Sequence, residues 1–132
     1  MSKRILLQTS IYDQIKAYTT FYNADAVPDN PSNPYGVYKV TGGVNGQIDD
    51  SANRQYLLDI DVFYRDINKD TTIIDNIADS IENGLENKSV IEDGFTYDFV
   101  TPIINDNIPT TDENMFRRSI TYTIKYMESE NE

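Results

Sequence analysis

Two aspartates spaced two residues apart are the side chains of this sequence best suited to metal chemistry. Asp59 and Asp61 stand in an alternating stretch, so a strand would place both carboxylates on one face, with Cα atoms roughly 6.5 to 7 Å apart. Two-metal nucleases use such pairs with further acids from neighbouring elements, such as Glu92 or Asp93 here. A phosphate backbone would also need basic residues nearby, and these are few. We therefore favour a half-buried strand that shows its acids to water.

A second acidic cluster begins like a calcium-binding loop. Asp66, Asn68 and Asp70 have the spacing of its first three ligands. However, Thr71 stands where the loop needs a glycine, and Ile77 stands where it needs a bidentate glutamate. The mismatch argues against a calcium site. We expect instead that this stretch precedes a helix and places Asp70 near the positive N-terminal end of that helix.

The sequence contains no histidine and no cysteine. It therefore has no imidazole base, no thiol nucleophile, no disulfide and no thiolate metal site. The run Gly42-Gly43-x-x-Gly46 is not a phosphate-binding loop, because it lacks the Lys-Ser/Thr ending and a helix after it. We expect no catalytic residue, no cofactor and no metal ion, and the sequence argues against an enzyme mainly by what it lacks.

Arg117 and Arg118 form the only adjacent basic pair after Lys3-Arg4. At the start of a final strand their side chains would point to opposite faces of the sheet, so they could not form one phosphate clamp. One of them is a candidate for pairing across a subunit interface, where arginine is enriched. A fully exposed arginine on an edge strand is an equally good interpretation.

The segment 42–53 loses all periodicity and is rich in Gly, Asn, Asp and Ser. A hairpin between the flanking strands would need only about two to five residues. The excess length leaves two interpretations open, a mobile surface hairpin and a binding loop. Under the second, the candidate assembly residues, besides the arginine pair, are Gly42, Gly43, Val44, Asn45, Gly46, Gln47, Ile48, Asp49 and Asp50.

Hydrophobic patterns predict the elements that would position these residues. Strict alternation predicts a strand over Tyr56–Tyr64, and an apolar stripe predicts a helix over Thr72–Leu85, opened by a capping box from Thr72 to Asp75. A first helix is predicted from Ser2 to about Tyr18. The residues expected to face the core from these elements are Leu58, Ile60, Val62, Tyr64, Ile74, Ile77, Ala78, Ile81, Leu85, Leu7, Ile11, Ile15 and Tyr18.

Shorter patterns predict strands at residues 21–27, 35–41, 95–100 and 116–127. The third of them is expected to end at about Val100, before Pro102 interrupts it. The element order is then α-β-β-β-α-β-β. We therefore predict an α+β fold, with a mixed, mainly antiparallel sheet of about four to five strands and two helices packed on one face.

Length and charge narrow the class of protein. The 132 residues suit one domain, 1–132, whose acidic end at 128–132 we expect to be a flexible tail. The net charge of −11, from 22 acids and 11 bases, opposes stable binding to a phosphate backbone. No signal peptide is apparent, because the apolar run after Lys3-Arg4 ends at Gln8, and no stretch approaches the length of a membrane span. We expect a soluble protein that is intracellular at synthesis.

The layout of almost the whole chain matches a known pattern. A helix from Ile5 to Tyr18 leads into a proline-rich stretch that ends in Asn33-Pro-Tyr-Gly-Val-Tyr38. The strand Leu57–Phe63 is followed by the helix Ile73–Leu85, and the chain closes on the run Arg117–Lys125. In order and length these elements resemble the tail terminator proteins of long-tailed bacteriophages, also called tail completion or tail-to-head joining proteins.

The resemblance implies a virion subunit that forms a hexameric ring at the tail–head junction after synthesis in the bacterial host cytoplasm. Such a ring caps the tail tube, ends its polymerisation and joins the DNA-filled head. The implied partners are other copies of this chain, the major tail tube protein and a head-completion or connector protein. DNA would pass through the lumen without specific binding, which agrees with the negative charge.

This structural role is the leading hypothesis for the chain. Among structural proteins, the alternative is a head-completion protein or another neck component. From a different class, the alternative is a divalent-metal-dependent nuclease that uses Asp59 and Asp61.

Overall fold

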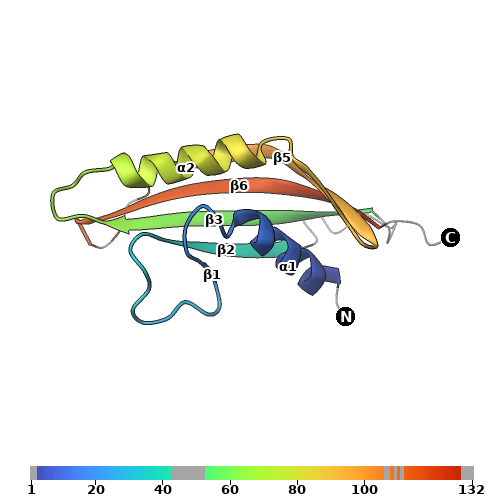
Figure 1. Cartoon of the computed structure of the whole chain (residues 1–132), viewed down its shortest axis with the longest axis horizontal. Coiled ribbons are helices and arrows are strands. Elements are labelled where there is room, and N and C mark those ends of the chain that lie inside the picture. Colours follow the sequence, from blue (N-terminus) through green and yellow to red (C-terminus); the bar gives the residue numbers. More distant parts are fainter. Residues whose placement is uncertain (1–2, 43–52, 106–107, 109, 111, 129–132) are drawn as a thin grey trace.

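The computed structural model describes residues 3–42, 53–105, 108, 110 and 112–128. Two helices and six strands make up this part of the chain (Figure 1). In chain order they are α1 (Lys3–Ile15), β1 (Phe21–Asn23), β2 (Tyr35–Gly42), β3 (Asn53–Arg65), α2 (Thr72–Leu85), β4 (Ser89–Glu92), β5 (Phe95–Asn105) and β6 (Met115–Glu128). The predicted α+β class is confirmed.

The strands form one sheet in the order β1-β2-β3-β6-β5-β4. β1 is parallel to β2, whereas the other neighbouring pairs are antiparallel. The two longest strands, β3 and β6, pair at the centre from Asn53 opposite Met127 to Arg65 opposite Met115. The sheet is therefore mixed and mainly antiparallel, as predicted.

The predicted number of four to five strands is too low, and the predicted order lacks one strand. The missing strand is β4, which has four residues and pairs with β5 across a turn in which Gly94 has a φ of +97°. A run this short carries too little alternation to be recognised in the sequence. β5 also continues past Pro102 to Asn105, through a register shift between Val100 and Ile103. Proline is tolerated at such an irregularity, because the missing N–H interrupts no regular ladder there.

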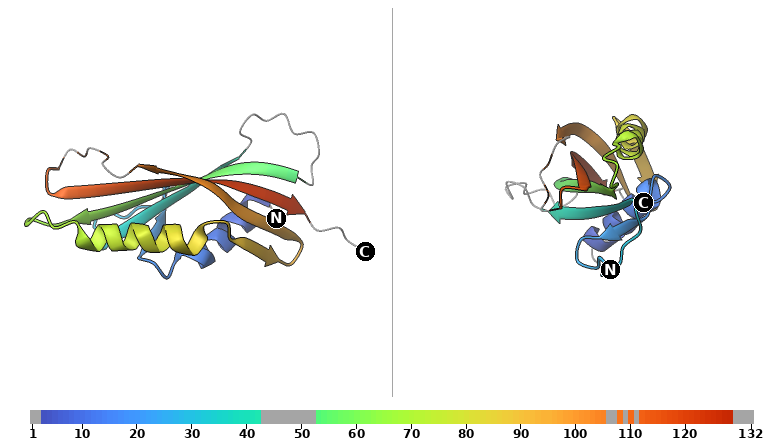
Figure 2. Two further views of the ribbon diagram at one scale, coloured as in Figure 1. Left: turned by 90° about the horizontal axis from the view of Figure 1, so that it is seen from above. Right: turned by 90° about the vertical axis from the view of Figure 1, so that its left-hand side faces the viewer.

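Both helices lie on the same face of the sheet, as predicted (Figure 2). α2 lies against β3 and β6, and α1 lies against β2. One core of apolar side chains fills the space between the two layers. Its most buried aliphatic members are Leu7, Ile11, Ile15, Val40, Leu58, Ile60, Val62, Ile74, Ile81, Leu85, Ile120 and Ile124.

The opposite face of the sheet is covered by neither helix, and we call it the open face (Figure 2). Alternate residues of four strands form it, and their side chains are half-buried or exposed where the structure describes them. They are Tyr35, Val37, Lys39 and Thr41 of β2, Leu57, Asp59, Asp61, Phe63 and Arg65 of β3, Arg117, Ser119, Thr121, Thr123 and Lys125 of β6, and Thr96, Asp98 and Val100 of β5.

α1 is shorter than predicted. It ends at Ile15, where the predicted end was Tyr18, because the chain tightens into a turn in which Tyr18 N donates a hydrogen bond to Ile15 O. Tyr18 still packs against the core, as the apolar pattern indicated. Its hydroxyl lies where a Cβ at position 84 would collide with it. This contact explains a glycine in the last turn of α2, where glycine otherwise weakens the helix.

The N-terminus of α2 differs from the predicted capping box. The N-cap residue is Thr71, and its side chain makes no capping hydrogen bond. Asp70 takes that role in part, because its Oδ1 accepts a hydrogen bond from Thr72 N at 2.9 Å. This hydrogen bond lowers the pKa of Asp70. Asp75 does not reach back to the cap, since its carboxylate accepts a hydrogen bond from Arg118 instead.

Candidate functional site

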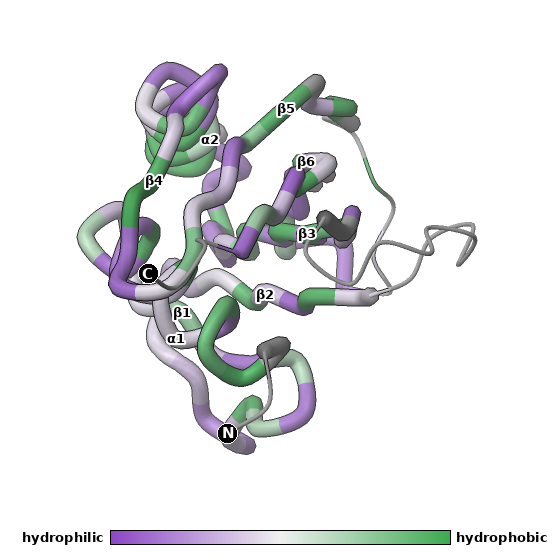
Figure 3. The backbone as a smooth tube through the Cα atoms, turned by 90° about the vertical axis from the view of Figure 1, so that its right-hand side faces the viewer, coloured by the Kyte–Doolittle hydropathy of each residue, from purple (hydrophilic) through white to green (hydrophobic). Residues whose placement is uncertain are grey.

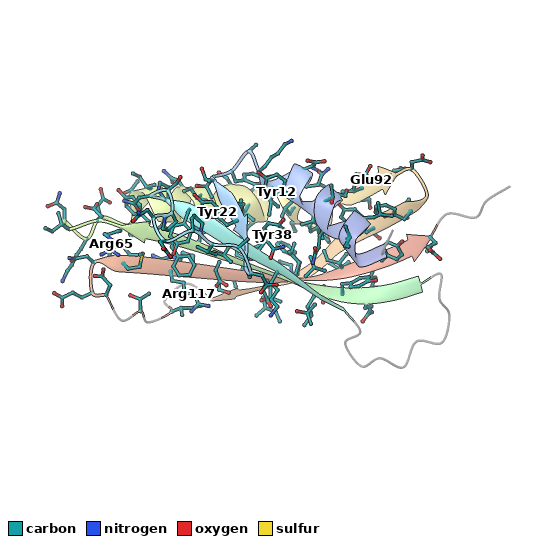
Figure 4. The ribbon with its side chains drawn as sticks, turned by 90° about the horizontal axis from the view of Figure 1, so that it is seen from below. Tyr12, Tyr22, Tyr38, Arg65, Glu92 and Arg117 are labelled. Atoms are coloured by element: carbon teal, nitrogen blue, oxygen red, sulfur yellow. The ribbon has the colours of Figure 1, made fainter. Side chains whose placement is uncertain are left out.

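A row of aromatic rings runs from Tyr22 of β1 onto the open face and ends in an arginine. We call Tyr22, Tyr35, Phe63 and Arg117 the aromatic row. The ring centroids of Tyr22 and Tyr35 are 6.0 Å apart. The rings of Tyr35 and Phe63 stack, with centroids 5.0 Å apart and an interplanar angle of 13°. The guanidinium carbon of Arg117 lies 5.6 Å from the Phe63 ring centroid. In Figure 4, Arg117 extends from the side of the sheet that faces away from the helices.

Strand register produces this row. Tyr35 is directly opposite Phe63 across β2 and β3, and Phe63 is directly opposite Arg117 across β3 and β6. Cross-strand neighbours of this kind have Cβ atoms about 4.5 to 5.5 Å apart, close enough for ring and cation–π contacts. Arg117 is also fixed from its other side, because its Nε donates a hydrogen bond to Asp61 Oδ1 at 3.1 Å. Partly exposed tyrosine and arginine side chains are typical of the residues that dominate protein–protein interfaces.

A cleft of about 410 Å³ adjoins the aromatic row, between the 29–33 loop and the end of β3. Asn33 fastens the loop, because its Oδ1 accepts a hydrogen bond from Arg65 N at 2.8 Å and its Nδ2 donates to Arg65 O at 3.0 Å. The guanidinium of Arg65 forms an ion pair with Asp112. The Tyr22 hydroxyl accepts a hydrogen bond from Ser32 N at 3.2 Å. These contacts hold the loop in place beside the open face.

The two candidate metal ligands lie on one strand face, as predicted, but each has a partner from β6. Asp59 Oδ1 accepts a hydrogen bond from the Thr121 hydroxyl at 2.8 Å, and Asp61 forms the ion pair with Arg117. Glu92 does not join them, since its carboxylate accepts a hydrogen bond from Ser10 of α1 on the helix side. Within the described ranges, no three His, Cys, Asp or Glu side chains are grouped closely enough to hold a metal ion. This geometry lends the nuclease hypothesis no support.

The calcium-like stretch forms a turn before α2. Asn68 N donates a hydrogen bond to Asp66 Oδ1 at 2.9 Å, and Lys69 adopts a φ of 60°. Asp70 points its carboxylate at the start of the helix, as predicted. The carboxylates of Asp66 and Asp70 are therefore used by the turn and the helix terminus.

The arginine pair divides between the two faces, as predicted. Arg117 is on the open face, whereas Arg118 is 7% exposed on the helix side. Its Nε donates a hydrogen bond to Asp75 Oδ1 at 2.9 Å, so Arg118 joins β6 to α2 within the subunit. Of the loop residues proposed for assembly, Gly42 ends β2 opposite Tyr56, and those from Gly43 to Asp50 lie outside the described residues.

A polar cluster that no sequence pattern predicted lies between α1 and the β4–β5 hairpin. Ser10 donates a hydrogen bond to Glu92 and lies 2.7 Å, from Oγ to hydroxyl oxygen, from Tyr97. Ser10 is 5% exposed and Tyr97 is 1% exposed. Ser10 and Glu92 also line a cleft of about 420 Å³, to which Asp13 and Asp93 contribute. The signal in the sequence is a serine beside the apolar stripe of α1, next to Ile11.

Tyr97 should make the free energy of unfolding depend on pH in the alkaline range. Burial, assisted by the nearby Glu92 carboxylate, raises the pKa of Tyr97 to about 12, against an unfolded value near 10. The folded chain therefore holds the proton of Tyr97 more tightly than the unfolded chain does. The resulting contribution to the free energy of unfolding is fully present below about pH 10 and is lost as the pH rises toward 12. We expect Tyr97→Phe to flatten the fall in unfolding free energy across this range, measured by urea denaturation at several pH values.

Tyr22→Phe is the matched control for that measurement. Hydrogen bonds from Ser32 lower the pKa of Tyr22, so its ionisation contributes to stability with the opposite sign. The control should therefore not flatten the alkaline loss of stability. If the unfolding free energy of Tyr97→Phe falls with pH as steeply as that of the unmodified chain, the raised pKa of Tyr97 is contradicted.

Comparisons with known proteins identify the fold only. No protein-family model matches the sequence, and no curated protein matches it. Among solved structures, one superposes on this chain with a TM-score of 0.68, over 100% of this chain and 99% of the other, at 14% sequence identity. The name of that protein states no activity, ligand or partner. Within the described part of this chain, neither helix is long and apolar enough to span a membrane.

Proposed function

We propose that this chain is a structural subunit of a bacteriophage virion, a tail terminator that forms a hexameric ring at the end of the tail tube. The ring ends polymerisation of the tube and provides the surface to which the DNA-filled head attaches. The partners are other copies of the chain, the major tail tube protein and the head-completion or connector protein. The proposal extends the resemblance in element order and length described above.

The open face, with its aromatic row, is the structural observation that supports this proposal. A subunit of a closed ring needs two unlike surfaces, because each copy contacts one neighbour through each of them. The open face and the helix-covered side are two such surfaces on opposite sides of one sheet. The net charge of −11 also suits a ring around DNA, because an acidic lining would let DNA pass without adhering.

A capping experiment in solution tests the proposal. The purified protein would be added in increasing amounts to tail tube protein that is polymerising, and tube lengths would be measured by electron microscopy. We expect the mean length to fall as the amount of added protein rises, because each capped end stops growing.

The order of addition supplies the control for this experiment. Protein added after polymerisation is complete should leave the lengths unchanged while still decorating tube ends. Unchanged lengths at every ratio, together with binding to isolated head connectors, would contradict the terminator role and favour a head-completion protein.

A further inference from the structure

The N-terminal end of α2 is fastened by side chains from outside the helix. Just before the helix, Asp70 Oδ1 accepts a hydrogen bond from Thr72 N at 2.9 Å. In the first turn, Asp75 Oδ1 accepts a hydrogen bond from Arg118 Nε of β6 at 2.9 Å. Arg118 is 7% exposed, so this ion pair joins the first turn to the sheet in a site that is largely shielded from solvent.

The last turn of α2, residues 82–86, has features that weaken it instead. It contains Gly84, and glycine is among the poorest helix formers. A Cβ at this position would collide with the Tyr18 hydroxyl, so a better helix former does not fit. Glu86 at the C-cap is exposed and places a negative charge at the negative pole of the helix dipole. Lys88 is the next base along the chain, and it forms no ion pair with a described residue.

A buried hydroxyl near this turn has no hydrogen-bond partner. Tyr122 of β6 is 0% exposed, and its hydroxyl makes no hydrogen bond within the part of the chain that the structure describes. Burial raises the pKa of Tyr122, and the Glu82 and Glu86 carboxylates raise it further, as expected of a hydroxyl that lies near the last turn. A buried hydroxyl without a partner destabilises the folded state, and contact with water removes the penalty. Opening of the last turn would supply that contact.

The apolar side of α2 opposes this opening. In Figure 3 the hydrophobic side of the helix faces the sheet. Ile74, Ala78 and Ile81 hold the earlier turns against the core, whereas Leu85 is the buried apolar residue of the last turn. Leu85 is 0% exposed, so opening would bring its side chain into water. The last turn is therefore held mainly by one side chain.

We propose that the last turn of α2 opens away from the sheet as a local unit, while the earlier turns stay in place. Burial of Leu85 favours the closed state. Gly84, the charge of Glu86 and hydration of the Tyr122 hydroxyl favour the open state. Segments that move when a protein binds a partner come from such parts of low local stability. Opening of this turn does not depend on the tail terminator role.

Introduced cysteines measure the opening, because the unmodified chain contains none. The variants Leu85→Cys, Ile81→Cys and Ile74→Cys each place one thiol at a position that is 0% exposed. The rate of labelling by a water-soluble thiol reagent reports how often each position opens. We expect Leu85→Cys to be labelled roughly tenfold faster than the other two, because a helix glycine and an unsatisfied hydroxyl each shift an opening equilibrium about fivefold or more.

Second substitutions in the Leu85→Cys variant test the causes. Tyr122→Phe removes the hydroxyl that opening would hydrate, so labelling should slow about fivefold or more. Glu86→Lys places a cation at the negative pole of the helix and should slow labelling about two- to fivefold. Tyr97→Phe is the matched control. It removes a hydroxyl that has a partner, Ser10, and it should not slow labelling.

Hydrogen exchange repeats the test in the unmodified chain, without any substitution. The Glu86 amide, which donates a hydrogen bond to Glu82 O, should exchange roughly tenfold faster than the Ile81 amide. Equal exchange of the two amides would overturn the local opening. So would labelling of Leu85→Cys no faster than that of Ile74→Cys, or only at the rate that global unfolding of the same variant allows, measured by urea denaturation. Labelling that Tyr122→Phe leaves unchanged would overturn it as well.

Discussion

Particles assembled without this protein should show full heads separated from tail tubes that exceed their normal length. Heads should still fill, because packaging of DNA needs no tail. Tubes should continue to grow, because each ring of a head-to-tail polymer presents the same surface to the next ring, and only a cap removes that surface. Electron microscopy of particles from a phage lacking the gene would measure both effects, and supplying the protein from a plasmid should restore normal lengths.

Other results of that deletion would contradict the terminator role in distinct ways. Tubes of normal length that fail to join heads would favour the head-completion alternative. Absence of tubes would point to a tube or initiator protein. Infectious particles of normal appearance would show that this chain is not essential at the tail–head junction.

Ile81→Ala should lower the free energy of unfolding by roughly 2 to 5 kcal/mol, the range for truncating a buried isoleucine to alanine. Ile81 is 0% exposed between α2 and the sheet, so the lost methyl and methylene groups would leave a cavity that the surrounding side chains fill only in part. Urea denaturation monitored by circular dichroism would measure the change.

Ile73→Ala is the matched control, because Ile73 lies on the same helix and is 45% exposed. Its truncation should change the unfolding free energy by about 0.5 kcal/mol or less. Ile77→Ala should fall between the two, since Ile77 packs against the core while remaining partly exposed. Equal losses for Ile81→Ala and Ile73→Ala would show that the stripe of α2 is not packed on the sheet.

The periodicity of apolar residues in the sequence was sufficient to predict the buried sides of the long strand β3 and of the helix α2. The alternation of Leu58, Ile60 and Val62 correctly predicted the buried side of β3, and the spacing of Ile74 and Ile81 predicted the buried side of α2. The short elements were harder to predict, because three or four residues carry little periodic signal. β4 was missed for this reason, and its pairing with β5 depends on a tight turn at Gly94.

The candidate site was predictable only in part. Side-chain parity along β6 placed Arg117 and Arg118 on opposite faces without a structure. The contact of Arg117 with Phe63 could not be predicted, because it requires β6 to lie beside β3 in one particular register. The Ser10–Glu92 hydrogen bond joins residues 82 positions apart, a separation at which local sequence patterns carry no information.

The two outer strands of the sheet are also its shortest, with three residues in β1 and four in β4. Unpaired N–H and C=O groups along an outer strand are a template for strand addition by another chain, and a short strand offers few of them. The two outer strands themselves would therefore contribute little to strand addition between copies of this protein.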